Sequence, residues 1–78
     1  MQYRKEVAME NTEGRMSIAQ LRGKRHATQR ELADLIGVTE PTYRSKEKGL
    51  TEFTLGEARK ICKHLNFPFA DITDGERD

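Results

Sequence analysis

The stretch of sequence that decides the fold is Thr28-Gln29-Arg30-Glu31-Leu32-Ala33-Asp34-Leu35-Ile36-Gly37-Val38-Thr39. Thr28 and Glu31 have the spacing of a capping box, which opens a helix, and apolar residues then recur along one side of that helix. Gly37 can adopt the positive φ that ends a helix. Val38 supplies an apolar side chain for the angle between two helices, and Thr39 can cap the helix that follows. The stretch therefore predicts a helix, a turn of about three residues and a second helix.

The chain on either side of this unit also has the pattern of short helices. Ser17 is placed to cap a first helix, which we expect to end near Gly23 and the basic run after it. Pro41 suits the start of a helix because no intrahelical N–H is needed there. We therefore expect a helix over about 40–48, closed by Gly49.

A second capping box, formed by Thr54 and Glu57, predicts a further helix. This helix has an apolar stripe at helical spacing, made of Leu55, Ala58, Ile61, Cys62 and Leu65. Pro68 then interrupts the chain, and the apolar residues after it suit one short final helix. No segment alternates with period two for long, and no hairpin turn dipeptide occurs. The prediction is an all-α fold, a compact bundle of five short helices.

Length and composition exclude several classes of protein. The 78 residues suffice for one domain and leave little room for a large catalytic pocket. No run of about 18 apolar residues occurs, and the first ten residues lack the apolar segment of a secretory signal, so neither a membrane span nor export is expected. A single cysteine, Cys62, fits a reducing cytoplasm. His26 and His64 have no carboxylate or thiol at ligand spacing, so we expect no metal, cofactor or small-molecule ligand.

The charges are unevenly distributed along the chain, whose formal net charge is +1. Residues 1–15, expected to form a flexible N-terminal arm, are neutral overall, and the polar tail 73–78 has a net charge of −2. Residues 16–72, expected to form the folded domain, have a net charge of +3. A strongly basic domain is the usual sign of nucleic-acid binding. The low net charge therefore predicts weak non-specific binding to DNA. It also makes the position of each basic residue in the fold important.

The order of helices and turn resembles a known family, the phage-repressor and Cro type (XRE-like) of helix-turn-helix domain, which has the lambda-repressor-like fold. The run 28–39 looks like its helix-turn-helix, and Thr42-Tyr43-Arg44-Ser45-Lys46-Glu47-Lys48-Gly49 fits its recognition helix and the glycine after it. The ending, with Ala58, Ile61, Leu65 and Asp71-Ile72, fits its fourth and fifth helices. The resemblance covers roughly residues 17–72. In this arrangement the recognition helix can lie in the major groove of DNA.

The resemblance implies which residues approach DNA. Those that would face base edges are Thr39, Glu40, Pro41, Thr42, Arg44 and Ser45. Those that would approach phosphates are Gln29, Arg30, Lys46, Lys48, Gly49 and Thr51, and Gln29 would also brace the recognition helix. Glu40 and Pro41 lack the bidentate groups that suit adenine or guanine, which makes Arg44 the best candidate for guanine. The alternatives are a phosphate contact by Arg44, or only an i, i+4 pair with Glu40.

Several neighbouring residues have an expected structural role. The resemblance implies an ion pair between Arg22 and Glu47, interpreted as structural because a half-buried charge needs a partner. Many members of the family have a large apolar residue where this chain has Lys46. We expect its stem to lie on the core and its ammonium to reach outward, toward phosphate. Tyr43 is expected in the core behind the recognition helix, and the three phenylalanines in the core, unless an exposed part of that cluster forms a dimer seam.

Together these features predict a sequence-specific transcriptional regulator of the repressor type, without catalysis. It would bind a palindromic double-stranded operator as a homodimer, with half-sites about 34 Å apart. The dimer would be weak without DNA, and its seam would come from the C-terminal helices or the arm. The alternative is an antitoxin-like or anti-repressor-type interaction module, whose acidic residues Glu40 and Glu52 and acidic tail face a basic protein. An enzyme is not expected, because no spacing assembles a nucleophile, a base and an oxyanion hole.

Overall fold

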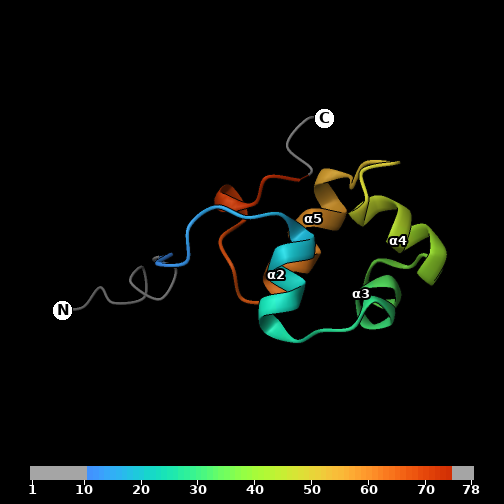
Figure 1. The fold of residues 1–78 in the computed structure, drawn as a ribbon, viewed down its shortest axis with the longest axis horizontal. Helices are drawn as coiled ribbons and strands as arrows, with labels where there is room; N and C mark the ends of the chain where they lie inside the picture. Colours follow the sequence, from blue (N-terminus) through green and yellow to red (C-terminus); the bar gives the residue numbers. More distant parts are fainter. Residues whose placement is uncertain (1–10, 75–78) are drawn as a thin grey trace.

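The computed structural model of the protein describes residues 11–74, which form four α-helices and one 3₁₀ turn (Figure 1). The elements are α2 (Ile18–Arg25), α3 (Gln29–Ile36), α4 (Glu40–Glu47), α5 (Leu55–His64) and η1 (Phe69–Asp71). No β-strand forms in this part of the chain, and none of its helices is long and apolar enough to span a membrane. The first ten residues of the predicted arm and the last four of the predicted tail lie outside the described residues.

The predicted count of five helices is not confirmed among residues 11–74, because the last element is not an α-helix. The expected final helix is the single 3₁₀ turn η1. Ile72, which follows it, has extended backbone angles (φ −86°, ψ 141°) and forms an isolated parallel bridge with Met16. Pro68 before the turn and this bridge after it leave too few residues for an α-helix.

Each α-helix begins at a hydroxyl residue whose side chain accepts a hydrogen bond from the backbone N–H three residues on: Ser17, Thr28, Thr39 and Thr54. The capping boxes at Ser17 and Thr54 are complete. At Thr28 only half of the predicted box forms, because the carboxylate of Glu31 contacts Nε2 of His64 at 2.7 Å instead. This contact connects α3 to the end of α5.

The first helix ends within the expected basic run, two residues beyond Gly23. Helix α2 continues through Gly23 to Arg25, and His26 closes it in the left-handed conformation (φ 59°). A glycine inside a helix costs only about 1 kcal/mol, and the Lys24 and Arg25 that follow are good helix formers. Gly37, by contrast, ends α3 as predicted, with φ 76°.

One hydrophobic core lies between the helices. Its buried members include Ile18, Leu21, Leu32, Ala33, Tyr43, Phe53, Ala58, Ile61, Cys62, Leu65, Phe67 and Ile72. The ring of Tyr43 is fully buried and meets the ring of Phe53 edge to face, with 5.7 Å between centroids. Tyr43 therefore anchors α4, the helix expected to reach DNA, to the core.

The single cysteine, Cys62, also lies in this core. Burial raises the pKa of the Cys62 thiol to about 11, which leaves it protonated and unreactive at neutral pH.

The two ends of the domain are joined to each other. Met16 donates its N–H to the carbonyl of Asp71 (3.1 Å), and Thr73 donates its N–H to the carbonyl of Met16 (3.0 Å). The carboxylate of Asp74 accepts from the first N–H of α2 at 3.4 Å. Figure 1 shows the two segments running side by side, away from α3 and α4. The domain is thus closed by backbone pairing between its first and last residues.

Residues 11–15, the described part of the expected arm, lie against the domain. The carboxylate of Glu13 forms two hydrogen bonds with the guanidinium of Arg25, at 2.8 and 2.9 Å. Asn11 donates from Nδ2 to the carboxylate of Asp71 at 2.9 Å. Two side chains of this segment thus contact the domain, and the boundary at residue 16 stays a prediction.

Candidate nucleic-acid interface

Helices α3 and α4 are joined by a tight turn, residues 37–39. The backbone N–H of Val38 donates to the carbonyl of Ala33 at 3.0 Å, and its side chain packs against the core. The hydroxyl of Thr39 accepts from the N–H of Thr42 at 3.3 Å, so the first turn of α4 is capped. This is the geometry of a helix-turn-helix, in which the second helix is presented at the surface.

The N-terminal half of α4 presents the predicted base-facing residues to solvent. Those that are exposed are Thr39, Pro41 and Thr42, and those that are half-buried are Glu40, Arg44 and Ser45. The loop after the helix is also exposed over Lys48, Gly49, Leu50 and Thr51. Leu50 is the most exposed large apolar side chain of the described residues, at 74%. Three of the expected phosphate contacts therefore surround an apolar tip.

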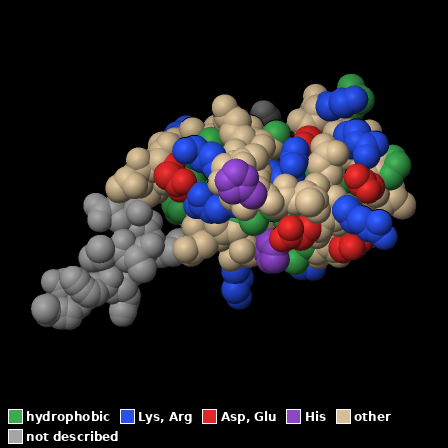
Figure 2. Space-filling model, turned by 60° about the horizontal axis from the view of Figure 1, so that its bottom comes forward, with side chains coloured by type: hydrophobic (Ala, Val, Ile, Leu, Met, Phe, Trp, Pro, Cys, Tyr) green, Lys and Arg blue, Asp and Glu red, His purple; other side chains and the backbone are tan. Residues whose placement is uncertain are grey.

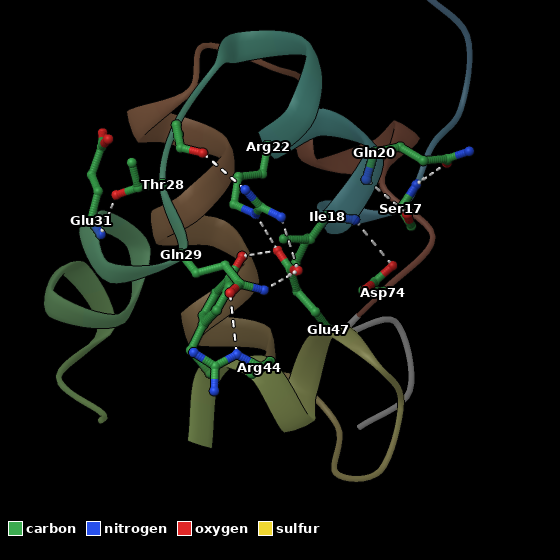
Figure 3. A network of polar contacts seen from close by, with 12 residues as sticks. Ser17, Ile18, Gln20, Arg22, Thr28, Gln29, Glu31, Arg44, Glu47 and Asp74 are labelled. Atoms are coloured by element: carbon green, nitrogen blue, oxygen red, sulfur yellow. Dashed lines mark hydrogen bonds and ion pairs between the residues drawn. The ribbon is translucent and has the colours of Figure 1, made fainter. Parts of the chain in front are cut away.

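The C-terminal half of α4 is instead fixed by a polar network around Glu47 (Figure 3). The Glu47 carboxylate, only 7% exposed, accepts from Arg22 Nε at 2.6 Å and from the Tyr43 hydroxyl at 2.7 Å. It also accepts from Gln29 Nε2 at 3.1 Å. Arg22 lies on α2 and Gln29 on α3, so one carboxylate connects three helices, and Arg22 and Glu47 form the expected pair.

The network keeps Glu47 charged. Burial alone would raise the pKa of Glu47, but hydrogen bonds from Arg22, Tyr43 and Gln29 outweigh it, and the pKa is lowered. Burial and the bond to Glu47 raise the pKa of Tyr43, which stays a donor. A buried carboxylate with this many donors is satisfied, whereas one that loses a partner is costly.

A second set of contacts continues from this network to the surface. The Gln29 side-chain oxygen accepts from Arg44 Nε at 3.3 Å (Figure 3). On its other side, Arg44 Nη2 contacts Glu40 Oε2 at 3.2 Å. Gln29 therefore braces the recognition helix. An amide has two N–H groups, so one remains for the expected phosphate contact. Arg44 makes the alternative pair with Glu40 while more than 40% of its side chain stays exposed.

The expectation that Lys46 reaches outward is wrong. Its side chain is only 11% exposed, and its ammonium contacts the Glu57 carboxylate and the Glu52 carbonyl, both at 3.1 Å. The chain after α4 folds back and brings the acidic first turn of α5 beside the lysine stem. A paired ammonium there closes the loop, so Lys46 connects α4 to α5.

Both signs of charge are present over the surface. Figure 2 shows Lys and Arg interspersed with Asp and Glu over one face, and this face has no continuous basic area. Among residues 11–74, no three His, Cys, Asp or Glu side chains gather in a way that could hold a metal ion. Arg30 and Lys48, two of the predicted phosphate contacts, are among the exposed basic residues of the domain.

A family model described as helix-turn-helix (HTH_3) matches residues 18–72. The chain belongs to this family, the XRE family of DNA-binding domains that includes the Cro and C1 types. The resemblance seen in the sequence is thereby confirmed over nearly its whole length. No curated protein matches the chain significantly.

Sequence reasoning missed how the surface arginine is held. The spacing of Glu40 and Arg44 indicated one contact of Arg44, the i, i+4 pair. The resemblance implied that Gln29 braces the recognition helix, but it did not indicate that the Gln29 oxygen would hold Arg44. That contact exists only because the turn places the two helices together.

Proposed function

We propose that the protein is a sequence-specific, repressor-like transcriptional regulator whose helix α4 enters the major groove of an operator. Membership of a DNA-binding helix-turn-helix family supports this proposal. The observation that carries it is the contrast along α4, which exposes its N-terminal half and fixes its C-terminal half through Glu47. A rigid helix with an exposed start is what base reading requires.

In this proposal, phosphate contacts set the register and base contacts select the sequence. Phosphates would be contacted by the free N–H of Gln29, by the side chains of Arg30, Lys48 and Thr51, and by the backbone at Gly49. The base-facing residues would be those exposed at the start of α4, with Arg44 the main reader of guanine. Lys46 leaves this set because its ammonium is occupied within the fold.

We further propose that the protein binds a palindromic operator as a homodimer. A single domain of this type reads few base pairs, and two-fold operators match two-fold dimers with half-sites about 34 Å apart. The half-buried Phe69 and a shallow hollow beside it, between α5 and η1, support a seam there. Such a protein would act in the cytoplasm, on the nucleoid when bound, and would need no catalytic group or cofactor.

Selection of bound sequences from a random pool of duplexes tests both proposals. A palindromic consensus, with two protein chains per duplex in sedimentation, is the expected result. Pools that show no enrichment would refute sequence-specific binding. A monomer on the selected duplex at saturating protein would refute the dimer.

One observation favours a second function, an antitoxin-like or anti-repressor-type interaction module. The guanidinium of Arg44 is already paired with Glu40, and the net charge of the chain is only +1. Both features reduce attraction to DNA and suit a protein partner. A salt titration distinguishes the two functions, because DNA binding weakens steeply with salt. Absence of affinity for any duplex at low salt would leave the protein-partner function.

A further inference from the structure

We infer that Glu40 is a specificity-determining residue, which positions Arg44 for a base edge and withholds its guanidinium from phosphates. The inference rests on the proposed function and adds a role for an acidic residue at the start of a DNA-reading helix. In this role Glu40 affects DNA recognition by positioning Arg44, and not only through a direct contact with a base.

The first argument is geometric, because the Arg44 guanidinium is held from two sides. Its Nε donates to the Gln29 side-chain oxygen at 3.3 Å, and its Nη2 contacts Glu40 Oε2 at 3.2 Å. Gln29 is itself held by the buried carboxylate of Glu47 at 3.1 Å. The direction of a long, flexible side chain is therefore set by a series of contacts that begins in the interior (Figure 3).

The second argument concerns the donors that remain. A guanidinium has five N–H donors in a fixed fork, and these two contacts use two of them. The remaining three, on Nη1 and Nη2, can address guanine O6 and N7. Arg44 can thus read a base without leaving Gln29 and Glu40, and it loses little conformational freedom on binding.

The third argument is electrostatic. Glu40 is 40% exposed and puts a negative charge beside the positive charge of Arg44. A phosphate that approaches Arg44 must also approach this carboxylate, and like charges brought together oppose binding. Base edges are neutral, and the amino group of a cytosine could donate to Glu40. Glu40 therefore opposes contact with the DNA backbone more than contact with the correct bases.

The test is Glu40→Gln, which removes the charge and keeps the shape of the side chain. Affinity is measured against salt on the duplex selected by the wild type and on a scrambled duplex. We expect tighter binding to the scrambled duplex and a slope of log K against log salt that is steeper by about 0.9, the value for one extra phosphate contact. One phosphate contact changes affinity about threefold between 50 and 200 mM salt. We therefore expect the affinity of the variant for the scrambled duplex to rise by about this factor at low salt. The ratio of specific to non-specific affinity should then fall about threefold or more relative to the wild type.

Two further variants isolate the mechanism. Asp34→Asn removes the same charge from an exposed position of α3 and should leave the affinity ratio unchanged. Glu40→Gln in an Arg44→Ala background should leave the salt slope unchanged, because Glu40 acts through Arg44. Thermal unfolding of each variant checks that the fold is intact.

The possible outcomes separate this inference from the proposed function. A wild-type protein that selects a consensus, with a Glu40→Gln variant of equal slope and equal ratio, overturns the inference alone. A steeper slope that persists without Arg44 also overturns it, because Glu40 would then repel phosphates by itself. A wild-type protein without affinity for any duplex overturns both.

Discussion

The two halves of α4 contain the same kind of ion pair in opposite surroundings. Arg22 and Glu47 meet at the C-terminal half, where the carboxylate is 7% exposed and has three donor residues. Glu40 and Arg44 meet at the N-terminal half, where both side chains are at least 40% exposed. A broken buried pair leaves an unpaired charge in the interior, whereas an exposed pair contributes about 0–1 kcal/mol. One pair therefore governs stability, and the other is free for the recognition role proposed for it.

The largest expected effect is that of Arg22→Ala on folding. The substitution leaves the Glu47 carboxylate without its main partner, and we expect the free energy of unfolding to fall by about 2–4 kcal/mol. Urea denaturation measures this loss. Arg30→Ala, at an exposed position of α3, should change stability by less than about 0.5 kcal/mol. Similar losses for both variants would contradict the structural role of the buried pair.

The next largest effect is that of Arg44→Ala on DNA recognition. We expect affinity for the selected duplex to fall by about 1–3 kcal/mol, with the consensus relaxed at one or two positions. Stability should change little, because the pair with Glu40 is exposed. Repeated sequence selection with the variant gives the measurement. An equal loss of affinity on every sequence would make Arg44 a phosphate contact.

Acid should weaken the buried network at the C-terminal end of α4. The pKa of Glu47 is lowered in the folded state from its ordinary value of 4.5. Its contribution to stability is therefore present above about pH 4.5 and is lost as the pH falls through the folded pKa. The loss should be smaller than that of Arg22→Ala, because a protonated Glu47 keeps hydrogen-bonding capacity.

Denaturation of the wild type and of Glu47→Gln between pH 7 and pH 3 checks this expectation. Glu13 and Glu31 also have lowered pKa values, and they titrate in both proteins. The difference between the two curves therefore isolates Glu47. Parallel curves would show that Glu47 does not contribute to the pH dependence.

The smallest expected effect distinguishes two lysines of the same helix end. Lys48→Ala should weaken binding to all sequences alike and reduce the salt slope by about 0.9, as for one lost phosphate contact. Lys46→Ala should leave the slope unchanged and lower stability by about 0.5–1 kcal/mol, because its ammonium pairs with Glu57. Salt titrations and denaturation of both variants test the contrast. A reduced slope for Lys46→Ala would show that its ammonium leaves Glu57 on DNA.

Much of the fold could be predicted because its signals are local. Caps at Ser17, Thr28, Thr39 and Thr54 join residues only three positions apart, and the left-handed turn at Gly37 depends on one residue. Prediction was less exact where local signals compete with distant contacts. Gly23 resembled a helix end but lies inside α2, and the expected last helix gave way to the bridge between Met16 and Ile72.

The sequence by itself determined the helix-turn-helix, the exposed start of α4, the buried position of Tyr43 and, through the family resemblance, the pairing of Arg22 with Glu47. Only the tertiary structure decided where competing polar side chains go. Lys46 turns to Glu57, and Gln29 joins the buried carboxylate to Arg44. The physical reason is that a long charged side chain can reach several partners. Which one it meets depends on how the helices pack, and the spacing of residues along the chain does not contain that information.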